Sequence, residues 1–347
     1  MSSGRRAVAK GFVAPDGEGI MVGGVSPVLR FVGMAAFLCT VACGRKPAPS
    51  APSAKIRLAL DWYPEPEHGG YFQALARGYY ADAGLDVEIL SGTPRLTAER
   101  RVAGNEADFG LSSSDQVLVA CERGLPLVAL TTTLQHDPIG LMVHAESPVR
   151  TFADLSGRRV AVSPGFLWFR YIVAHFGLHD VQEVPPTYSV ANFLHDPEYI
   201  QQAFVTSEPY FARQGGAETR TLLVRDAGYD DYRVLVGRRD FVAAHPEETH
   251  RFVAAALRGW RDFLESPDPG LSAILQRNPE TNPALARNGW QVLKDGHFVD
   301  GFAERGEAVG QMTDARWREQ ADILKGIGAL SPAADPRAVY TNDYQPK

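Results

Sequence analysis

The chain has 347 residues, of which 45% are hydrophobic, and its formal net charge is −6 at pH 7. A chain of this length and composition can bury a sizeable core and is expected to form about two domains. Beyond the first 43 residues the sequence has no basic run, so nucleic-acid binding is excluded as a function.

The amino end is typical of an export signal. Arg30 precedes the apolar run Phe31–Val41, which is too short to span a bilayer but has the length of a signal-peptide core. The segment before Met21 is unlike a signal peptide, so Met21 is an alternative start. Small residues precede Cys43, and this end resembles a bacterial lipoprotein box. Residues 1–43 are interpreted as a signal peptide with Cys43 lipidated; ordinary cleavage or an uncleaved anchor is the alternative.

A tether follows the signal. Residues 44–54 are rich in proline, alanine and serine, and an extended tether would reach roughly 30 Å at about 3 Å per residue. Beyond Cys43, Cys121 is the only remaining cysteine, so neither a disulfide nor a cysteine-based metal site is expected. Because Cys121 lies in an apolar helical pattern, we expect a buried thiol.

The first strand and helix signals lie in residues 56–90. Ile56–Leu60 is a short apolar run, Phe72–Tyr79 has apolar residues at helical spacing, and Val87–Leu90 is rich in β-forming residues. This pattern predicts a strand–helix–strand unit with parallel strands, whose ligands lie outside the carboxyl ends of the strands. The loop 61–71 is therefore predicted to form half of a binding cleft.

The rest of the chain continues the α/β alternation and ends in helices. Further strands are expected at 107–111, 127–131, 140–144, 159–162, 184–187, 203–206, 221–224 and 233–236, and helices from Thr93 and at 112–123, 166–176, 208–214, 246–264, 284–293 and 315–327. These elements predict an α/β fold of two lobes with a hinge and an interlobe cleft. The expected lobes are residues 55–139 with 245–347, and residues 140–244.

The first loop also carries a pattern that resembles a known family. Its pattern Leu-Asp-Trp-x-Pro-x-x-x-His-x-Gly is met by Leu60, Asp61, Trp62, Pro64, His68 and Gly70, with further matches at Gly84–Val87, Ala107–Gly110, Asp154–Gly157 and Tyr340–Tyr344. The chain resembles the solute-binding proteins of ABC importers, in the cluster of thiamine-pyrimidine and nitrate, sulfonate and taurine binders. The resemblance implies a periplasmic binding protein fold of the second type, with an ABC permease and ATPase as partners.

The resemblance also implies roles for single residues. In pyrimidine-binding members an aromatic residue and a histidine of the first loop contact the ligand, and an acidic residue of the second lobe pairs with an exocyclic amine. On this chain these are Trp62, His68 and Glu208. A eukaryotic member makes the thiamine pyrimidine with a histidine and a pyridoxal-phosphate lysine, but Ser112 and Gln116 stand at the lysine and helical histidine positions, and its cysteine cluster is absent. The chain is therefore not expected to be an enzyme, and no cofactor or metal is expected.

The residue types of the cleft suit a planar, nitrogen-bearing ring, because they offer flat apolar faces with a few directional hydrogen-bonding groups. The predicted ligand-binding residues are Trp62, Tyr63, His68, Tyr71, Ser112, Ser113, Gln135, His136, Trp168, Tyr188, Asn192 and Glu208. An oxyanion ligand would need more fixed positive charge and is the second choice.

Several of these residues have a structural alternative that the sequence leaves open. The aromatic residues can pack in a core, His68 can fix its loop, Ser112 and Ser113 can cap a helix, His136 can belong to the hinge, and Glu208 can stabilise a helix start. The overall hypothesis is an extracytoplasmic, membrane-anchored lipoprotein, a monomer, that closes on a small aromatic or heterocyclic solute. A pyrimidine synthase and a signalling sensor are the rival functions.

Overall fold

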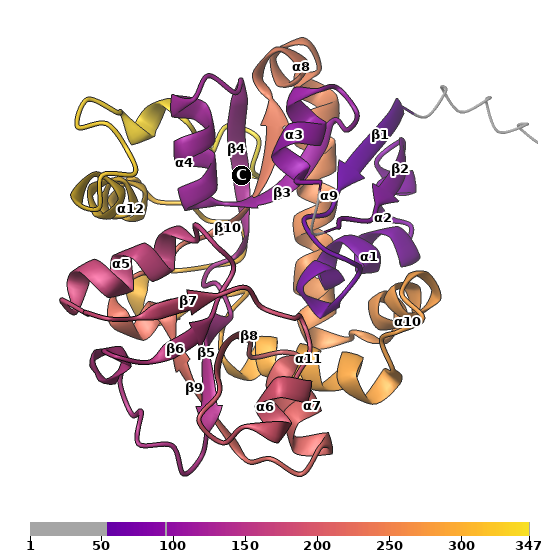
Figure 1. The fold of residues 1–347 in the computed structure, drawn as a ribbon. Coiled ribbons are helices and arrows are strands. Elements are labelled where there is room, and N and C mark those ends of the chain that lie inside the picture. Colours follow the sequence, from indigo (N-terminus) through magenta and orange to yellow (C-terminus); the bar gives the residue numbers. More distant parts are fainter. Residues whose placement is uncertain (1–53, 94–95, 347) are drawn as a thin grey trace, which may run out of the picture. The chain divides into compact units, whose positions relative to one another are not determined.

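The structure is a computed structural model that describes residues 54–93 and 96–346. The predicted signal peptide, the lipidation of Cys43 and residues 44–53 of the tether lie outside the described residues. Ala54, expected at the end of the tether, already pairs with Leu85 in a sheet. The described strands form two five-stranded sheets (Figure 1).

The first sheet has the order β2-β1-β3-β10-β4. Its strands are β1 (Ala54–Ala59), β2 (Leu85–Leu90), β3 (Phe109–Ser113), β4 (Leu127–Leu134) and β10 (Arg233–Arg238). β1 pairs in parallel with β2 and β3, whereas β10 runs antiparallel to both β3 and β4.

The second sheet repeats this arrangement in the order β7-β6-β8-β5-β9. Its strands are β5 (Ile139–His144), β6 (Arg159–Ala161), β7 (Gln182–Val184), β8 (Ile200–Phe204) and β9 (Thr219–Leu223). β6 is parallel to β7 and β8, and β5 is antiparallel to β8 and β9. In each sheet the antiparallel strand is the one that the chain enters from the other sheet, so the chain crosses twice, after β4 and after β9.

Helices and short 3₁₀ segments connect the strands. The helices are α1 (Gly69–Ala76), α2 (Tyr79–Asp82), α3 (Ala98–Ala103), α4 (Ser114–Glu122), α5 (Leu167–His175), α6 (Ala191–His195), α7 (Glu208–Gln214), α8 (Arg239–Ala244), α9 (Pro246–Glu265), α10 (Asp268–Arg277), α11 (Pro283–Asp295) and α12 (Asp314–Gly326), and the 3₁₀ segments are η1 (Pro66–His68), η2 (Phe152–Leu155), η3 (Val224–Ala227), η4 (Ala303–Arg305) and η5 (Pro336–Ala338). A search of the described part finds no helix with the length and apolarity needed to cross a membrane.

The packing of α1 on α9 sets the position of the loop that precedes α1. The apolar stripe of α9 predicted from the sequence is buried and includes Phe252 and Trp260. A Cβ atom on Gly70 would lie 2.1 Å from the Trp260 ring, and one on Gly259 would lie 2.2 Å from the Gly70 carbonyl oxygen. Both positions therefore require glycine, and the close approach anchors α1 directly after the loop 61–68.

Three predicted positions differ from the structure. The helix expected from Thr93 begins at Ala98 after Thr97, and Thr93 instead bridges to Leu96. The helix expected from Ser112 begins two residues later at Ser114, because Ser112 and Ser113 pair with β10. β10 was expected with the second lobe but lies in the first sheet; its partners come from more than 95 residues earlier in the chain, and local sequence patterns do not encode such pairing. The lobe boundaries themselves stay a prediction.

Candidate ligand-binding site

Loops that follow parallel strands of both sheets bring two aromatic side chains into contact. Trp62 lies in the loop after β1, and Tyr188 in the loop after β7. Their ring centroids are 5.4 Å apart with planes inclined at 42°, and Tyr63 meets the Trp62 ring edge-on at 5.5 Å. This is the position at which open α/β sheets hold ligands.

The loop that carries Trp62 is shaped by its own residues. The Glu65 carboxylate accepts from the backbone N–H of His68, and the His68 ring accepts from the backbone N–H of Glu65, so the two residues form a capping box around η1. Pro66 occupies the first turn of η1, where no N–H is needed. Pro66 and the capping box together fix the course of the loop into α1.

His68 is held inside this loop. It is 4% exposed; its Nδ1 accepts from the Glu65 N–H at 3.2 Å, and its Nε2 lies 3.0 Å from Asp61 Oδ1. Because Nδ1 is an acceptor, the ring proton is on Nε2 and is donated to Asp61. Burial lowers the pKa of His68 to about 4, although the Glu67 carboxylate acts in the opposite direction. His68 is therefore neutral at pH 7, and both its nitrogens are used in fixing the loop.

Replacing His68 with phenylalanine is expected to lower the free energy of unfolding by about 2 kcal/mol at pH 7.5, because two buried hydrogen bonds are lost. The unfolded pKa of 6.5 exceeds the folded pKa of about 4, so wild type loses stability as pH falls through this window, and the phenylalanine variant does not. The wild-type loss reaches about 2 kcal/mol at pH 5. Urea unfolding should therefore show a difference at pH 7.5 that nearly vanishes at pH 5. An equal difference at both pH values would mean that His68 is not buried in its neutral form.

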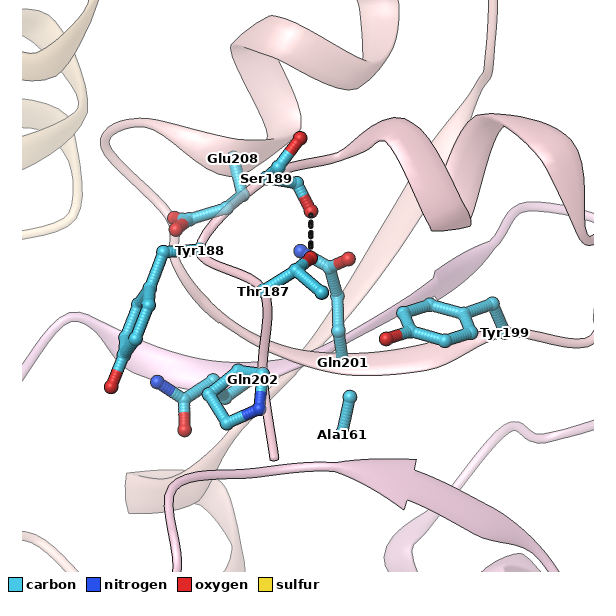
Figure 2. Close-up of a pocket in the computed structure, with 9 residues that line it drawn as sticks. Ala161, Thr187, Tyr188, Ser189, Tyr199, Gln201, Gln202 and Glu208 are labelled. Carbon is cyan, nitrogen blue, oxygen red and sulfur yellow. Dashed lines mark hydrogen bonds between the residues drawn. The ribbon is translucent and has the colours of Figure 1, made fainter. Parts of the chain in front are cut away.

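A pocket lies at the carboxyl ends of the second-sheet strands. Its lining residues are Ala161, Pro186, Thr187, Tyr188, Ser189, Tyr199, Gln201, Gln202 and Glu208, and Figure 2 shows Tyr199 on the side opposite Tyr188. The cavity has a volume of only about 10 Å³, far below the roughly 300–1,000 Å³ typical of small-molecule sites. A ring of drug size therefore requires the contact between Trp62 and Tyr188 to open.

Tyr188 stands at the mouth of this pocket. It is 55% exposed and has a φ of 53°, in the left-handed region that non-glycine residues rarely adopt. Its hydroxyl lies 3.3 Å from Ser163 Oγ, and the Ser163 N–H donates to Gln202 Oε1 at 2.6 Å. An unusual backbone conformation thus presents this ring to the loop of the first sheet.

Glu208 lines the same pocket. Its Oε2 accepts from the Phe204 N–H at 2.9 Å and from Ser207 Oγ at 2.7 Å, and burial raises its pKa. The residue also occupies the first turn of α7, where a carboxylate is favourable. Both interpretations of Glu208 are therefore compatible with its position.

Carboxyl groups from both sides approach each other beside Glu208. The Thr206 hydroxyl, after β8, donates to Glu67 of the first loop. Burial, together with the charges of Glu67 and Glu208, raises the pKa of Glu65 well above its usual value. The tryptophan-bearing loop therefore meets the turn that carries Glu208.

A half-buried arginine pairs with two further carboxylates at the edge of the first sheet. Arg233 begins β10 and pairs with Asp61 and, at 3.4 Å, with Asp137. Burial lowers the pKa of Arg233 to about 10, so the guanidinium stays charged at pH 7. Burial and neighbouring carboxylates raise the pKa of both Asp137 and Asp231 well above the ordinary value.

Two of the predicted aromatic residues lie in the core and not at the pocket. Tyr71 is fully buried and meets the Trp260 ring edge-on at 5.9 Å. Trp168 is buried against Phe169 in the core that includes the second sheet. Helix α1 turns Tyr71 towards α9 and α5 turns Trp168 inward, so neither residue lies at the pocket, and their ligand contacts stay a prediction.

Gln135 and His136 tie the crossing after β4 to the C-terminal part of the chain. The Gln135 amide donates to the carbonyl oxygens of Ala308 and Gln311 and accepts from Arg316. His136 is fully buried, with Nδ1 2.8 Å from Asp230 and Nε2 3.0 Å from Glu307. All these polar atoms are used within the chain, which fits the hinge interpretation of His136; the ligand contacts of both residues stay a prediction.

Ser112, Ser113 and Asn192, three further predicted residues, form hydrogen bonds within the chain. The Ser112 hydroxyl donates to Glu99, and the Ser113 hydroxyl donates to Asp115, so neither side chain caps α4. Asn192 is exposed and donates to the hydroxyl of Tyr199, a pocket residue, at 3.4 Å.

Five polar residues of the pocket were not predicted from the sequence. Thr187, Ser189, Tyr199, Gln201 and Gln202 line it but were not among the predicted residues. The rule that ligands lie at strand carboxyl ends could have found them, because they follow β7 or lie in and beside β8. In the part of the chain that the structure describes, no group of three or more histidine, cysteine, aspartate or glutamate residues could hold a metal ion.

The topology corresponds to that of a known fold. The periplasmic aliphatic sulphonate binding protein SsuA of Escherichia coli superposes with a TM-score of 0.64 at 13% identity, covering 86% of this chain and 94% of that protein. The chain thus has the periplasmic binding protein fold, as the resemblance predicted.

The sequence model of the NMT1/THI5-like family matches residues 65–269, more than half of the chain, and the chain belongs to this family. The riboflavin-binding protein RibY of Chloroflexus aurantiacus is 26% identical over 313 residues, which cover 86% of this chain and 89% of that protein. The 4-amino-5-hydroxymethyl-2-methylpyrimidine phosphate synthase THI11 of Saccharomyces cerevisiae is 24% identical over 313 residues, covering 84% and 87%. The relatives therefore include both a binding protein and an enzyme, and the predicted family is confirmed.

Proposed function

We propose that this protein is the extracytoplasmic substrate-binding lipoprotein of an ABC importer and captures a small aromatic or heterocyclic solute by closure. The observation that carries the proposal is the contact between Trp62 and Tyr188, which joins loops from the two sheets beside the pocket. A ligand ring entering between them would stack on both faces, as flat nitrogen heterocycles do on aromatic side chains. Glu208 at the pocket wall would accept a hydrogen bond from the polar edge of the ring.

Two relatives support a planar heterocycle as the ligand. RibY is named for binding riboflavin and THI11 for making an aminopyrimidine phosphate; a thiamine-pyrimidine precursor or related vitamin fragment is therefore the proposed class. A sulfonate is the second candidate, because SsuA shares the fold. The charges at the site disfavour it, since Arg233 is already paired with two carboxylates.

The rival function is a pyrimidine synthase. The resemblance places its pyridoxal-phosphate lysine at Ser112 and its helical histidine at Gln116. Ser112 lies in β3, and its hydroxyl donates a hydrogen bond to Glu99. Serine offers no amine for a Schiff base. The residues at these two positions support a receptor that binds its ligand without catalysing a reaction.

The proposal also includes a membrane anchor and a partner protein for the receptor. A lipidated Cys43 would hold a monomer on the membrane, where a closed lobe pair could present the ligand to a permease. A sensor that reports the same ligand to a signalling protein is the alternative, and neighbouring genes for a permease and ATPase, as opposed to a kinase, would distinguish the two.

The proposal is tested by mass spectrometry of compounds that co-purify, followed by thermal shift with riboflavin, 4-amino-5-hydroxymethyl-2-methylpyrimidine and an alkanesulfonate. A ring compound at 100 times its Kd should add about 2.7 kcal/mol to stability, which raises Tm by roughly 5–10 °C. Stabilisation by the sulfonate alone would replace the proposed ligand class. Pyridoxal-phosphate absorbance on a lysine adduct would favour the synthase.

A further inference from the structure

Two carboxyl oxygens near Trp62 have no hydrogen-bond partner among the described residues. Glu67 Oε2 and Asp137 Oδ1 are both shielded from solvent, and only 7% of Asp137 is exposed. The other oxygen of each group is used: Glu67 Oε1 accepts from Thr206, and Asp137 Oδ2 faces Arg233 at 3.4 Å. Buried acceptors are normally satisfied, so these two indicate a donor that comes from outside the chain.

Both groups lie close to the loop that carries Trp62. Glu67 belongs to the loop, and Asp137 shares Arg233 with Asp61, the residue directly before Trp62. Asp61 also accepts a hydrogen bond at 3.0 Å from His68, the residue directly after Glu67. The two oxygens therefore lie in one region, approached from the loop by Glu67 and from the end of β4 by Asp137.

The charge balance of this region selects among ligands. Arg233 pairs with Asp61 and Asp137, and His68 contributes no charge at pH 7 because its pKa is lowered to about 4. Carboxylates in a partly desolvated region repel anions and attract N–H groups and cations. A phosphate ester or a sulfonate entering here would place like charges together.

We infer that Glu67 and Asp137 form an acceptor subsite beside the pair of Trp62 and Tyr188, and that this subsite binds an N–H-bearing or cationic edge of the ligand. The inference rests on the proposed function and adds the charge class of the solute, which is neutral or cationic. The subsite is separate from Glu208, whose Oε2 is already bonded to Phe204 and Ser207.

The test uses two matched ligand pairs that differ in one donor. The first pair is 4-amino-5-hydroxymethyl-2-methylpyrimidine and the same ring with methyl in place of the amine; the second is riboflavin and its N3-methyl derivative. Calorimetry measures all four on wild type, Glu67→Gln and Asp137→Asn. In at least one pair, wild type should bind the donor-bearing member about tenfold more tightly, and each variant should lose most of this preference while its affinity for the methylated member changes less than about threefold.

Matched controls keep the test specific. Glu106→Gln and Asp322→Asn remove one surface carboxylate each, at side chains that are 62% and 77% exposed, and both should bind as wild type does. Thermal unfolding without ligand confirms that the variants fold, and the half-buried position of Glu67 makes Glu67→Gln tolerable.

The outcomes separate the subsite from the proposed function. Binding in which both members of each pair are equal, or in which the variants keep the wild-type preference, overturns the subsite while the receptor function stands. Tight binding of riboflavin 5′-phosphate or an alkanesulfonate in place of the uncharged rings also overturns it. If no ring compound binds wild type, the proposed function fails and the subsite fails with it.

Discussion

Replacing Arg233 with methionine is expected to lower the free energy of unfolding by about 2–3 kcal/mol at pH 8, between the costs of breaking an exposed and a fully buried ion pair, because its carboxylates are left unpaired. Arg233 is half-buried, with 20% of its side chain exposed, and pairs with Asp61 and Asp137 at the start of β10. Asp231 nearby already has its pKa raised by burial and by the charge of Asp137. Without the guanidinium, the remaining negative charges oppose folding more strongly. Chemical unfolding with urea at several pH values measures the effect.

The pH dependence of this loss has a definite sign. A carboxyl group whose folded pKa lies above its unfolded value contributes stability that is complete below the unfolded pKa and is lost as pH rises through the folded pKa. The pKa of Asp137 is already raised from 3.8, and removing Arg233 raises it further. The deficit of Arg233→Met should therefore be largest at pH 8 and should shrink as pH falls towards 4.

Two controls test the physical cause. Arg233→Lys keeps a positive charge and should lose clearly less stability than the methionine variant. Arg287→Met breaks an exposed pair with Asp268, whose side chains are 49% and 73% exposed, and should cost less than about 1 kcal/mol. A methionine variant as stable as wild type at pH 8, or one whose deficit is the same at every pH, would show that Arg233 does not neutralise this cluster.

The parts of the site that are local in sequence could be predicted. A strand followed by a loop with Trp62, His68 and two prolines places that loop at the carboxyl end of a sheet, and the structure has it there. The capping box of Glu65 and His68 also depends on residues three apart. That this loop forms half of a binding cleft stays a prediction.

The direction in which an aromatic side chain points could not be predicted in the same way. Tyr71 and Tyr188 have the same chemistry, but Tyr71 packs against Trp260, which is 189 positions away along the chain, and is fully buried. Tyr188 instead depends on a positive φ in a loop without a periodic pattern. Burial by distant elements and loop conformation leave no local signature.

The cluster of charged residues at the site could not be predicted from the sequence either. Asp61, Asp137 and Arg233 come from three separate segments that only the sheet order β1-β3-β10-β4 brings together. Two other arginines, Arg170 and Arg213, donate to Ile327 and Asn288 respectively. The unpaired acceptors of Glu67 and Asp137 become visible only once their neighbours are known.

Replacing Trp62 with alanine is expected to weaken binding of the ring ligand by roughly 100-fold, because one face of the ring loses its aromatic wall. Trp62 is half-buried beside Tyr188, with ring centroids 5.4 Å apart. The Trp62→Phe variant keeps a flat apolar wall and should lose much less. Calorimetry with the ligand identified by mass spectrometry gives the affinities.

Tyr188→Ala should weaken binding by a similar factor, since Tyr188 supplies the opposite wall, whereas Tyr188→Phe removes only the hydroxyl near Ser163 and should change affinity by less than about threefold. The double alanine variant should lose affinity by a smaller factor than the product of the two single factors, because one ligand ring stacked between Trp62 and Tyr188 couples their effects. Phe211→Ala is the matched control: Phe211 is 39% exposed and touches Tyr210 edge-on, so its removal should leave affinity nearly unchanged. If Trp62→Ala binds as wild type does while Tyr63→Ala does not, the ligand lies at the outer edge of the loop and not between the two sheets.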